Sequence, residues 1–323
     1  MAQVIKKQFP GVRIAMLIQR YTSEIVEENG DVDHVLFYDN GERPLPFFHL
    51  IETIRSERFD TVFHTHPRFH LALLTWLAGI PVRVGTGYRW YSFLFNRKVY
   101  EHRKDAKRHE LEYNLNLLQA IGCAAVAEAV VPRLAVKEQA LESVKSLLSG
   151  LGVRESDQVV ILHPGSGKSA RDWQVKNFGT LARRLSALPD VKIVITGGRL
   201  EQNIVREVQT MAGESAIALV NQLNLKEYSA LAKCSALFIA NSTGPIHIAA
   251  AVGTPVIGLY PQVTPLSAAR WGPYTPLKTI FSPAGQPLDC TRCIDKKENV
   301  CACMETISVE EVYQAALKYI MKD

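Results

Sequence analysis

The residues best suited to bind a phosphate group lie in one polar loop, Pro164–Trp173, which follows an apolar run. This loop combines glycines and hydroxyls with the cations Lys168 and Arg171. Glycines let the backbone approach a ligand, and charge-assisted hydrogen bonds hold anions. Its Gly-Lys-Ser sequence lacks the upstream glycine at the spacing of a P-loop. We therefore expect a phosphate-binding loop of another kind; the alternative is a solvated loop rich in glycine and serine.

Two further polar turns follow apolar runs in the same half of the chain. The pair Gly197–Gly198 precedes Glu201, whose carboxylate could accept hydrogen bonds from ribose hydroxyls. The turn Asn241–Gly244 leads into a helix that we expect to start at Pro245, where proline costs least. A hydroxyl of this turn could cap the helix, whose free N–H groups and positive dipole end suit a phosphate. The alternative is an ordinary capped helix.

A parallel sheet would bring these three turns together. Apolar runs alternate with amphipathic stretches along the chain, which is the pattern of parallel α/β domains. The carboxyl ends of parallel strands meet at one edge, where ligands bind. In the second half we expect strands at Val159–His163, Val191–Thr196, Ala216–Val220, Ala236–Ala240 and Pro255–Tyr260, and helices at Asn177–Leu188, Leu200–Met211, Lys226–Lys233, Pro245–Val252 and Val309–Met321.

The first half shows the same alternation and predicts a second α/β domain. Strands are expected at Val12–Ile18, His34–Tyr38, Phe59–His64 and Val82–Val84, and helices at Glu24–Glu28, Phe47–Glu57, Phe69–Ala78 and Asp105–Ile121. The periodic stretch Leu134–Leu148 indicates a crossover, which Ser149–Gly152 ends. With 323 residues the chain suits about two domains. We expect them over 1–150 and 151–305, with a C-terminal helix over 306–323 and a cleft between the sheets.

The composition excludes several classes of protein. Hydrophobic residues make up 47% of the chain and charged residues 21%, which is typical of a globular protein. The net charge of +5 is too small to indicate nucleic-acid binding. No apolar run approaches the ~18–20 residues of a membrane helix, and the first ten residues lack a signal-peptide pattern. We therefore expect a cytoplasmic protein that binds no nucleic acid and needs no disulfide framework.

The three turns and their surroundings resemble the donor domain of glycosyltransferase family 9, the ADP-heptose:lipopolysaccharide heptosyltransferases and their relatives. The resemblance is carried by His163-Pro-Gly-Ser-Gly, Arg171-Asp-Trp173, Gly197-Gly198, Leu223-Asn-Leu-Lys-Glu227 and Asn241-Ser-Thr-Gly-Pro-Ile-His-Ile-Ala-Ala-Ala-Val-Gly-Thr-Pro-Val256. It implies a GT-B architecture, in which two Rossmann-like domains with parallel sheets face each other and the last helix crosses back to the first domain. It also implies inverting transfer from a nucleotide-sugar, without a metal or other cofactor.

The resemblance assigns roles to residues of the three turns. Arg171, with Lys168 as a second candidate, would neutralise the leaving diphosphate. Glu201 would contact the ribose and Leu223 would line the base pocket. For His247, an ordinary half-buried histidine is an equal alternative. The implied donor-binding set is Gly165, Ser166, Gly167, Lys168, Arg171, Gly198, Glu201, Leu223, Asn241, Ser242, Thr243, Gly244 and His247.

Two departures from the family pattern affect these expectations. Many heptosyltransferases have Asp where this chain has Ser242, which leaves the sugar open between a heptose and a related one. Relatives also start with a strand and a Gly-Asp loop, whose Asp is the family's proposed general base. This chain opens at Val4-Ile-Lys-Lys-Gln-Phe-Pro10, inside the helix that follows. The first domain would therefore lack a central strand, exposing sheet edges.

Three hypotheses for the function remain open at this point. The first is an active glycosyltransferase whose true start lies ~20 residues upstream, since a strand, a loop and half a helix are missing. The second is a truncated, non-catalytic relative that binds a nucleotide-sugar without turnover. The third is another GT-B enzyme that uses a different donor, such as a nucleotide-sugar epimerase. Binding of ADP and ADP-heptose, compared with UDP-sugars, distinguishes these readings.

The stretch Gly87–His109 suits an acidic acceptor at a membrane surface. It holds seven Lys or Arg against two acids, interleaved with six aromatic residues. This composition fits an anionic glycolipid such as a phosphorylated lipid A core. The alternative is a solvated loop with a few aromatic residues turned inward. The acceptor-contact candidates in this half are His64, His66, Arg68 and Arg89, and the two histidines could instead cap the sheet.

Four cysteines near the C-terminus suggest a metal site at first sight. Their spacing is Cys290-x-x-Cys293 and Cys301-x-Cys303, and the second pair lacks the usual zinc-ligand spacing. Similar cysteine-rich tails occur in relatives that need no metal for transfer. We therefore expect a reduced loop, with structural zinc or a redox pair as the alternative.

Overall fold

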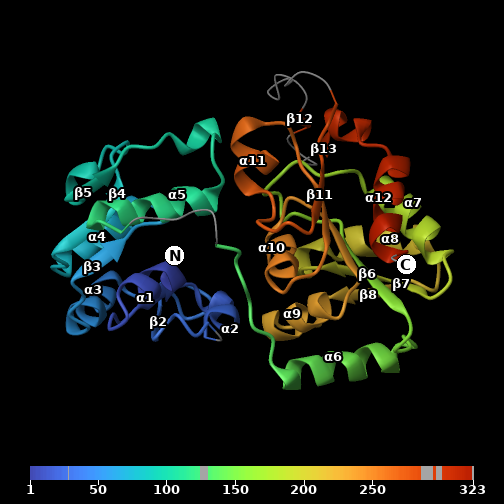
Figure 1. Cartoon of the computed structure of the whole chain (residues 1–323), viewed down its shortest axis with the longest axis horizontal. Helices are drawn as coiled ribbons and strands as arrows, with labels where there is room; N and C mark the ends of the chain where they lie inside the picture. The colour runs from blue at the N-terminus through green and yellow to red at the C-terminus, as the bar shows by residue number, and fades with distance from the viewer. Residues whose placement is uncertain (28, 124–129, 285–293, 296–299, 322–323) are drawn as a thin grey trace. The chain divides into compact units, whose positions relative to one another are not determined.

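A computed structural model of the chain describes residues 1–27, 29–123, 130–284, 294–295 and 300–321. The chain divides into two compact units, Met1–Val130 and Val131–Asp323 (Figure 1). The expected crossover appears as α6 (Glu138–Gly150), and it packs within the second unit. Its Val144 and Leu148 side chains are buried in that unit's core, which is why the division lies before α6 and not at residue 150.

The second unit is built on one parallel sheet of six strands. Its spatial order is β11-β10-β9-β6-β7-β8. The strands are β6 (Gln158–His163), β7 (Val191–Gly197), β8 (Ile217–Val220), β9 (Leu237–Asn241), β10 (Val256–Leu259) and β11 (Lys278–Phe281). The first five confirm the strands expected from apolar runs. The sixth was not expected, because an edge strand such as Lys278–Phe281 has an exposed end and only half-buried side chains.

Both faces of this sheet are covered by helices, as Figure 1 shows. Alternate residues of β6 are buried in two different hydrophobic cores. Val160 and Leu162 lie in the first core, and Val159 and Ile161 lie in the second core, on the other face of the sheet. Strand side chains alternate between faces, so a continuous apolar run implies cover on both. The first core includes α7 (Val175–Ser186), α8 (Gln202–Ala212) and α12 (Val309–Ile320), and the second includes α6, α9 (Leu225–Lys233) and α10 (Gly244–Ala251).

The last helix, α12, packs on the second unit's own sheet. Its Val312, Ala316 and Ile320 side chains are buried in the same core as Leu237 and Ile257. A capping box formed by Ser308 and Glu311 fixes its start. The apolar face of α12 is therefore buried within the second unit, and the crossing back to the first domain stays a prediction. Shorter elements of this unit are α11 (Ala268–Trp271), β12 (Ile294–Asp295) and β13 (Val300–Cys301).

The first unit has two separate parallel sheets instead of one. β1 (Ala15–Ile18) pairs with β2 (His34–Phe37), whereas β4 (Val82–Thr86) lies between β3 (Thr61–Phe63) and β5 (Arg97–Val99). In the part of the chain that the structure describes, no strand joins β1 to β3. Every residue of these two strands is only half-buried. Among the described residues, β1 and β3 therefore each have one edge without a strand partner, and the expected exposure of sheet edges stays a prediction.

The helices of the first unit match the expected ones closely, apart from their ends. They are α1 (Ala2–Gln8), α2 (Ser23–Val26), α3 (Phe47–Ser56), α4 (Phe69–Leu77) and α5 (Glu110–Asn116), which continues as a 3-10 turn over Leu117–Ile121. Further 3-10 turns lie at Arg20–Thr22, Ser92–Leu94, Arg103–Asp105, Arg199–Glu201, Thr264–Leu266 and Ala302–Thr306. Among the described helices of either unit, none is long and apolar enough to span a membrane.

Candidate functional site

The three polar turns follow three neighbouring strands of the six-stranded sheet. β6 lies at the centre, with β7 on one side and β9 on the other. The chain winds outward from β6 toward β8 in one direction and toward β11 in the other. The reversal at β6 and β9 is a topological switch point, where open α/β sheets bind their ligands. The expected convergence at one sheet edge is therefore present.

Asn241 ties the first turn to the end of β9. The side chain is fully buried, with 0% exposed. Its amide nitrogen donates to the Pro164 carbonyl at 2.6 Å, and its amide oxygen accepts from the Trp173 N–H at 2.9 Å. The bonded residues stand at the two ends of the phosphate-binding candidate loop. The Asn241 amide therefore holds the two ends of this loop together. The donor contact predicted for Asn241 stays a prediction.

The loop itself contains two consecutive residues in the left-handed region. Gly167 has a φ of +57° and Lys168 a φ of +64°. The Ser169 hydroxyl and N–H both donate to the Ser166 carbonyl, at 2.7 and 3.0 Å. Ser166 is only 5% exposed, and its hydroxyl finds no hydrogen-bond partner among the described residues. An orphaned buried hydroxyl is costly, so it points to a polar ligand at this loop.

The two cations of the loop differ in their surroundings. Lys168 is exposed, whereas Arg171 is half-buried beside the fully buried Trp173. The Trp173 ring N–H donates to the Ile307 carbonyl at 2.9 Å, which anchors the end of the loop in the core. Two cations within four residues after Gly-Ser-Gly give the loop basic groups suited to an anionic ligand.

Glu201 joins the first loop to the second. One carboxylate oxygen accepts from the Gly167 N–H at 3.0 Å, and the other accepts from the Gly198 N–H at 2.8 Å. A Cβ added at Gly165 would lie 2.0 Å from the Glu201 carboxylate. The glycine at position 165 is therefore explained by a packed carboxylate. The ribose contact predicted for Glu201 remains a prediction, and any such contact must share the carboxylate with two amides.

A buried polar network lies next to the Glu201 carboxylate, which is 3.6 Å from the His163 Nε2. The His163 side chain is 6% exposed, and its Nδ1 lies 2.8 Å from the Thr196 hydroxyl and 3.3 Å from the Tyr228 hydroxyl. These hydroxyls are 3.1 Å apart. Burial lowers the pKa of His163 to about 4, an effect that Glu201 opposes. Burial also raises the pKa of Tyr228, so the histidine and the phenol are both uncharged at neutral pH.

The third turn opens helix α10 without a side-chain cap. Thr243 is the N-cap residue, Pro245 lies in the first turn, and no capping side-chain hydrogen bond is formed. Tyr260, which follows β10, donates its hydroxyl to the Trp271 carbonyl at 3.0 Å, and burial raises the pKa of this phenol. The prediction that the helix is capped within this turn is confirmed for the position of the N-cap residue, Thr243. The prediction that a hydroxyl side chain forms the cap is wrong. Of the other predicted donor residues, His247 is half-buried on α10, and Leu223 is half-buried and packs against the second core.

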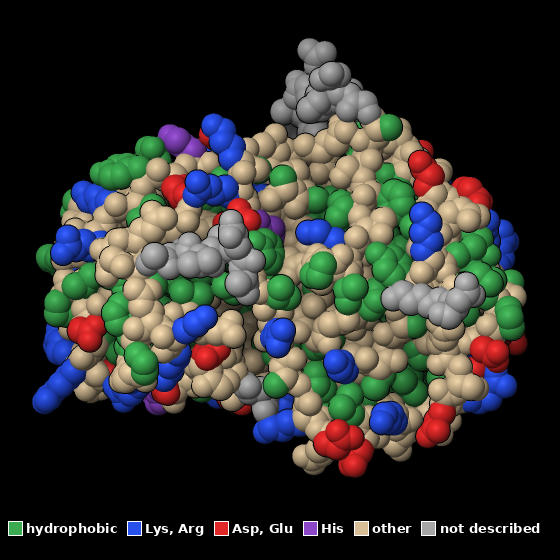
Figure 2. Space-filling model, in the orientation of Figure 1, with side chains coloured by type: hydrophobic (Ala, Val, Ile, Leu, Met, Phe, Trp, Pro, Cys, Tyr) green, Lys and Arg blue, Asp and Glu red, His purple; other side chains and the backbone are tan. Residues whose placement is uncertain are grey.

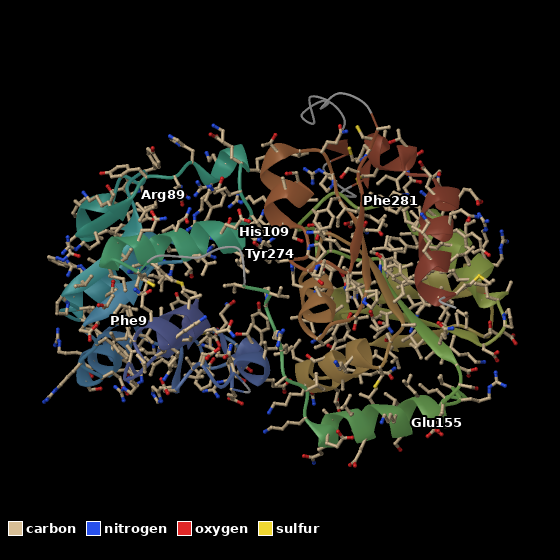
Figure 3. The ribbon with its side chains drawn as sticks, viewed as in Figure 1. Phe9, Arg89, His109, Glu155, Tyr274 and Phe281 are labelled. Carbon is tan, nitrogen blue, oxygen red and sulfur yellow. The ribbon has the colours of Figure 1, made fainter. Side chains whose placement is uncertain are left out.

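The acceptor candidates lie in the first unit, and their surroundings differ. His64 is 6% exposed, and its Nε2 lies 3.0 Å from the Thr75 hydroxyl. This favours the structural alternative for His64. His66 and Arg68 are exposed and joined by a 2.8 Å hydrogen bond from the Arg68 Nε to the His66 Nε2. Arg89 is also exposed, and Figure 3 labels it near β4 and β5.

The cysteine cluster is described only in part. Cys290 and Cys293 lie outside the described residues, whereas Cys301 and Cys303 are buried in the first core of the second unit. No group of three His, Cys, Asp or Glu side chains arranged to hold a metal occurs within the described ranges. The side chains of Cys301 and Cys303 pack in this core, and the zinc or redox alternative, which needs Cys290 and Cys293, stays a prediction.

Sequence reasoning missed the network below Glu201. His163 was noticed as part of a motif but received no role, and Thr196 and Tyr228 were not considered. Thr196 is the last residue but one of β7, and Tyr228 is on α9, 32 residues away. The only available signal was a polar residue at the end of each apolar strand run, His163 and Thr196.

Comparison with known families places this site in context. Residues 47–301 match the model of glycosyltransferase family 9 (heptosyltransferase). The match covers more than half of the chain, so the chain belongs to this family of glycosyltransferase enzymes. The predicted family, and the α/β fold with parallel sheets that it implies, are confirmed.

Individual relatives agree with this assignment. The chain is 25% identical over 265 residues to lipopolysaccharide heptosyltransferase 3 of Escherichia coli, covering 79% of this chain and 76% of the relative. It is 22% identical over 329 residues to the heptosyltransferase 3 of strain K12, covering 99% and 92%. The fold is similar to that of a family 9 glycosyl transferase from Veillonella parvula, with a TM-score of 0.84, 21% identity, and coverage of 100% and 92%. It is also similar to E. coli ADP-heptose lps heptosyltransferase II, with a TM-score of 0.77, 17% identity, and coverage of 99% and 93%.

Proposed function

We propose that this glycosyltransferase moves a heptose, or a closely related sugar, from an ADP-sugar to a lipopolysaccharide core or similar glycan. The transfer inverts the anomeric carbon, requires no metal and takes place on the cytoplasmic side. A solved relative, E. coli heptosyltransferase WaaC, was crystallised with ADP and with ADP-2-deoxy-2-fluoro heptose. The observation that carries the proposal in this chain is the unpaired, buried hydroxyl of Ser166 in a positively charged glycine loop at the switch point.

The chemistry follows from the charges around that loop. In the reaction, the bond between the sugar's anomeric carbon and the diphosphate breaks as an acceptor hydroxyl oxygen forms a new bond to the opposite face of that carbon. The diphosphate leaves with the bonding electrons, and the proton of the acceptor hydroxyl passes to water. Arg171 and Lys168 would stabilise the charge that develops on the diphosphate, which is how an enzyme lowers such a barrier.

Calorimetric titration tests the donor. We expect ADP and ADP-heptose to bind and UDP to bind at least tenfold more weakly. Ser166→Ala should weaken ADP binding about tenfold, since a buried hydrogen bond to a charged group is worth about 1.5–3 kcal/mol. Ser186→Ala is the matched control, because its hydroxyl only donates to the Arg183 carbonyl within α7. Absence of ADP binding would refute the proposal, and a preference for UDP would favour another donor class.

Turnover separates an enzyme from a binding protein. With ADP-heptose and a phosphorylated lipid A core as acceptor, we expect ADP release, and we expect Arg171→Ala to lower the rate by at least tenfold. Arg199→Ala, at an exposed position after the second turn, is a matched loss of a cation from the same sheet edge. Binding of ADP-heptose without any ADP release would support the non-catalytic alternative instead.

We also propose that an exposed aromatic and basic surface of the first unit contacts the anionic glycolipid and the surrounding membrane. Trp90 is 72% exposed and stacks on Phe69 at 4.8 Å between ring centroids, and Phe93 is 67% exposed. Exposed cations lie in the same segments, namely Arg68, Arg89, Arg97 and Lys98. Figure 2 shows basic and hydrophobic side chains side by side on the part of this unit where Figure 1 places β5. Aromatic rings beside cations suit an anionic membrane surface.

Vesicle sedimentation tests this surface. Phosphatidylglycerol vesicles should retain the protein at low salt, whereas phosphatidylcholine vesicles should not. Changing both Trp90 and Phe93 to Ser should reduce retention several-fold. Leu200→Ser is the control, because Leu200 is 96% exposed in the second unit. Equal retention by the double variant and the control would refute the role of these aromatic residues.

A further inference from the structure

We propose that the Glu201 carboxylate, positioned by His163, is an internal clamp that holds the Gly165–Gly167 backbone in the shape that receives the donor diphosphate. With respect to the diphosphate, Glu201 and His163 are then positioning residues, which act on it through the loop. The clamp closes the first loop onto the Gly197–Gly198 turn. Its effect on the donor rests on the function proposed above, but the clamp itself is a property of the free protein.

The contacts of Glu201 show why its carboxylate acts as a clamp. It accepts one N–H from each of two loops, those of Gly167 and Gly198, at 3.0 and 2.8 Å. The side chain is 12% exposed, so little water competes for these bonds. Charge-assisted hydrogen bonds from backbone amides are about twice as strong as neutral ones. The carboxylate therefore joins its own loop to Gly167, which lies 34 residues earlier in the chain.

Gly167 gives the clamp a specific consequence. Its φ of +57° is followed by +64° at Lys168, a strained conformation for a residue with a side chain. Something must hold this pair of residues in the left-handed region, and the Gly167 N–H is bonded to Glu201. The same local turn sets the position of Ser166, whose buried hydroxyl has no hydrogen-bond partner among the described residues. Releasing Glu201 should therefore relax the part of the loop proposed to meet the phosphates.

The direction of the hydrogen bonds assigns a role to His163. The Tyr228 and Thr196 hydroxyls and the His163 Nδ1 form a chain with spacings of 3.1 and 2.8 Å. If Tyr228 donates to Thr196 and Thr196 donates to Nδ1, every hydroxyl proton has an acceptor. The ring proton then sits on Nε2, which lies 3.6 Å from the Glu201 carboxylate. The opposite tautomer would aim a lone pair at the carboxylate, so the first arrangement is favoured.

A glycine substitution opens the clamp while leaving its residues in place. A Cβ at Gly165 would meet only the end of the flexible Glu201 side chain, at 2.0 Å, so Gly165→Ala should expel the carboxylate without moving the backbone. Gly150→Ala is the matched control, since nothing lies within 4 Å of its Cβ position. In the free protein, we expect Gly165→Ala to raise the exchange rate of the Gly167 amide at least tenfold and the control to leave it unchanged. An unchanged rate in Gly165→Ala would overturn the clamp.

Two substitutions of His163 test the positioning role. The amide nitrogen of Gln can replace Nε2 and face Glu201, whereas the shorter Asn can replace only Nδ1. We expect His163→Asn to speed Gly167 exchange and weaken ADP binding about tenfold, and His163→Gln to stay within about threefold of the unchanged protein. A merely structural histidine would give equal losses in both, which would overturn the role.

Two further measurements keep the proposal testable. If both His163 variants fail to fold, Thr196→Val breaks the same chain with a side chain of the same shape, and unchanged Gly167 exchange there would refute it. Amide exchange in the free protein tests the clamp alone. Failure of the unchanged protein to bind ADP would instead refute the proposed function while leaving the clamp intact.

Discussion

The two units use similar strands and helices but differ in how fully they bury them. Every residue of β9 is fully buried, and it pairs with a strand on each side. In the first unit, β1 pairs on one side only and all four of its residues are half-buried. A continuous sheet fixes the ends of its strands, and so the turns that follow them. The turn at Gly167–Lys168, with two consecutive residues in the left-handed region, follows a strand of that continuous sheet.

Amide exchange tests this contrast directly and should give the largest effect. Because the β1 and β3 edges are unpaired and half-exposed, the amides of Met16 and Val62 should exchange about a thousandfold faster than those of Val160 and Phe238. That ratio corresponds to about 4 kcal/mol of difference in opening free energy. Hydrogen exchange followed by residue-resolved detection measures it. Comparable protection in both units would show that their sheets are equally stable.

A matched pair of asparagines, one in each unit, tests whether the cost of losing a side-chain amide depends on its burial or on its hydrogen bonds alone. The Asn241 and Asn96 amides each donate to a proline carbonyl at 2.6 Å and accept a backbone N–H. Asn241 is buried and Asn96 is exposed. Asn241→Ala should cost about 3 kcal/mol of unfolding free energy and Asn96→Ala about 1 kcal/mol, since only the first leaves buried partners unsatisfied.

Urea unfolding gives both values for these asparagine variants. A similar loss in both would mean that the bonds themselves, and not their burial, decide the cost. Binding of ADP adds a second comparison, because Asn241 closes the proposed donor loop and Asn96 lies in the other unit. Only the Asn241→Ala substitution should weaken ADP binding.

Each unit contains a buried histidine whose pKa is lowered by burial, and the resulting pH dependence of stability is the smallest of the expected effects. Burial lowers the pKa of both His64 and His163 to about 4. The unfolded chain, with a pKa near 6.5, binds these protons first, so stability is full above about pH 6.5 and falls as the pH drops toward 4. Between pH 7 and 5.5 we expect about 1 kcal/mol to be lost per histidine. Urea unfolding of His64→Gln and His163→Gln at both pH values should each show a shallower pH dependence. An unchanged dependence would contradict the burial.

Local sequence patterns predicted most strands and helices because those elements are set by near neighbours. The continuous run Ala236–Ala240 gave a buried strand, and Pro245 gave the start of a helix in the correct turn. The strands Arg97–Val99 and Lys278–Phe281 were not predicted, because both carry charge and lie at sheet edges. Charged edge strands lack the apolar signal that marks a central strand.

The sequence by itself determined the parallel sheet, the glycines and cations of the donor loop, and the family to which they belong, because each of these is recorded in adjacent residues. Only the tertiary structure decided that α6 belongs with the second unit and that the Asn241 and Glu201 side chains hold loops together. The reason is physical. Asn241 bonds to Pro164 across 77 residues, and Glu201 bonds to Gly167 across 34, so neither partner can be recognised until the strands are placed side by side.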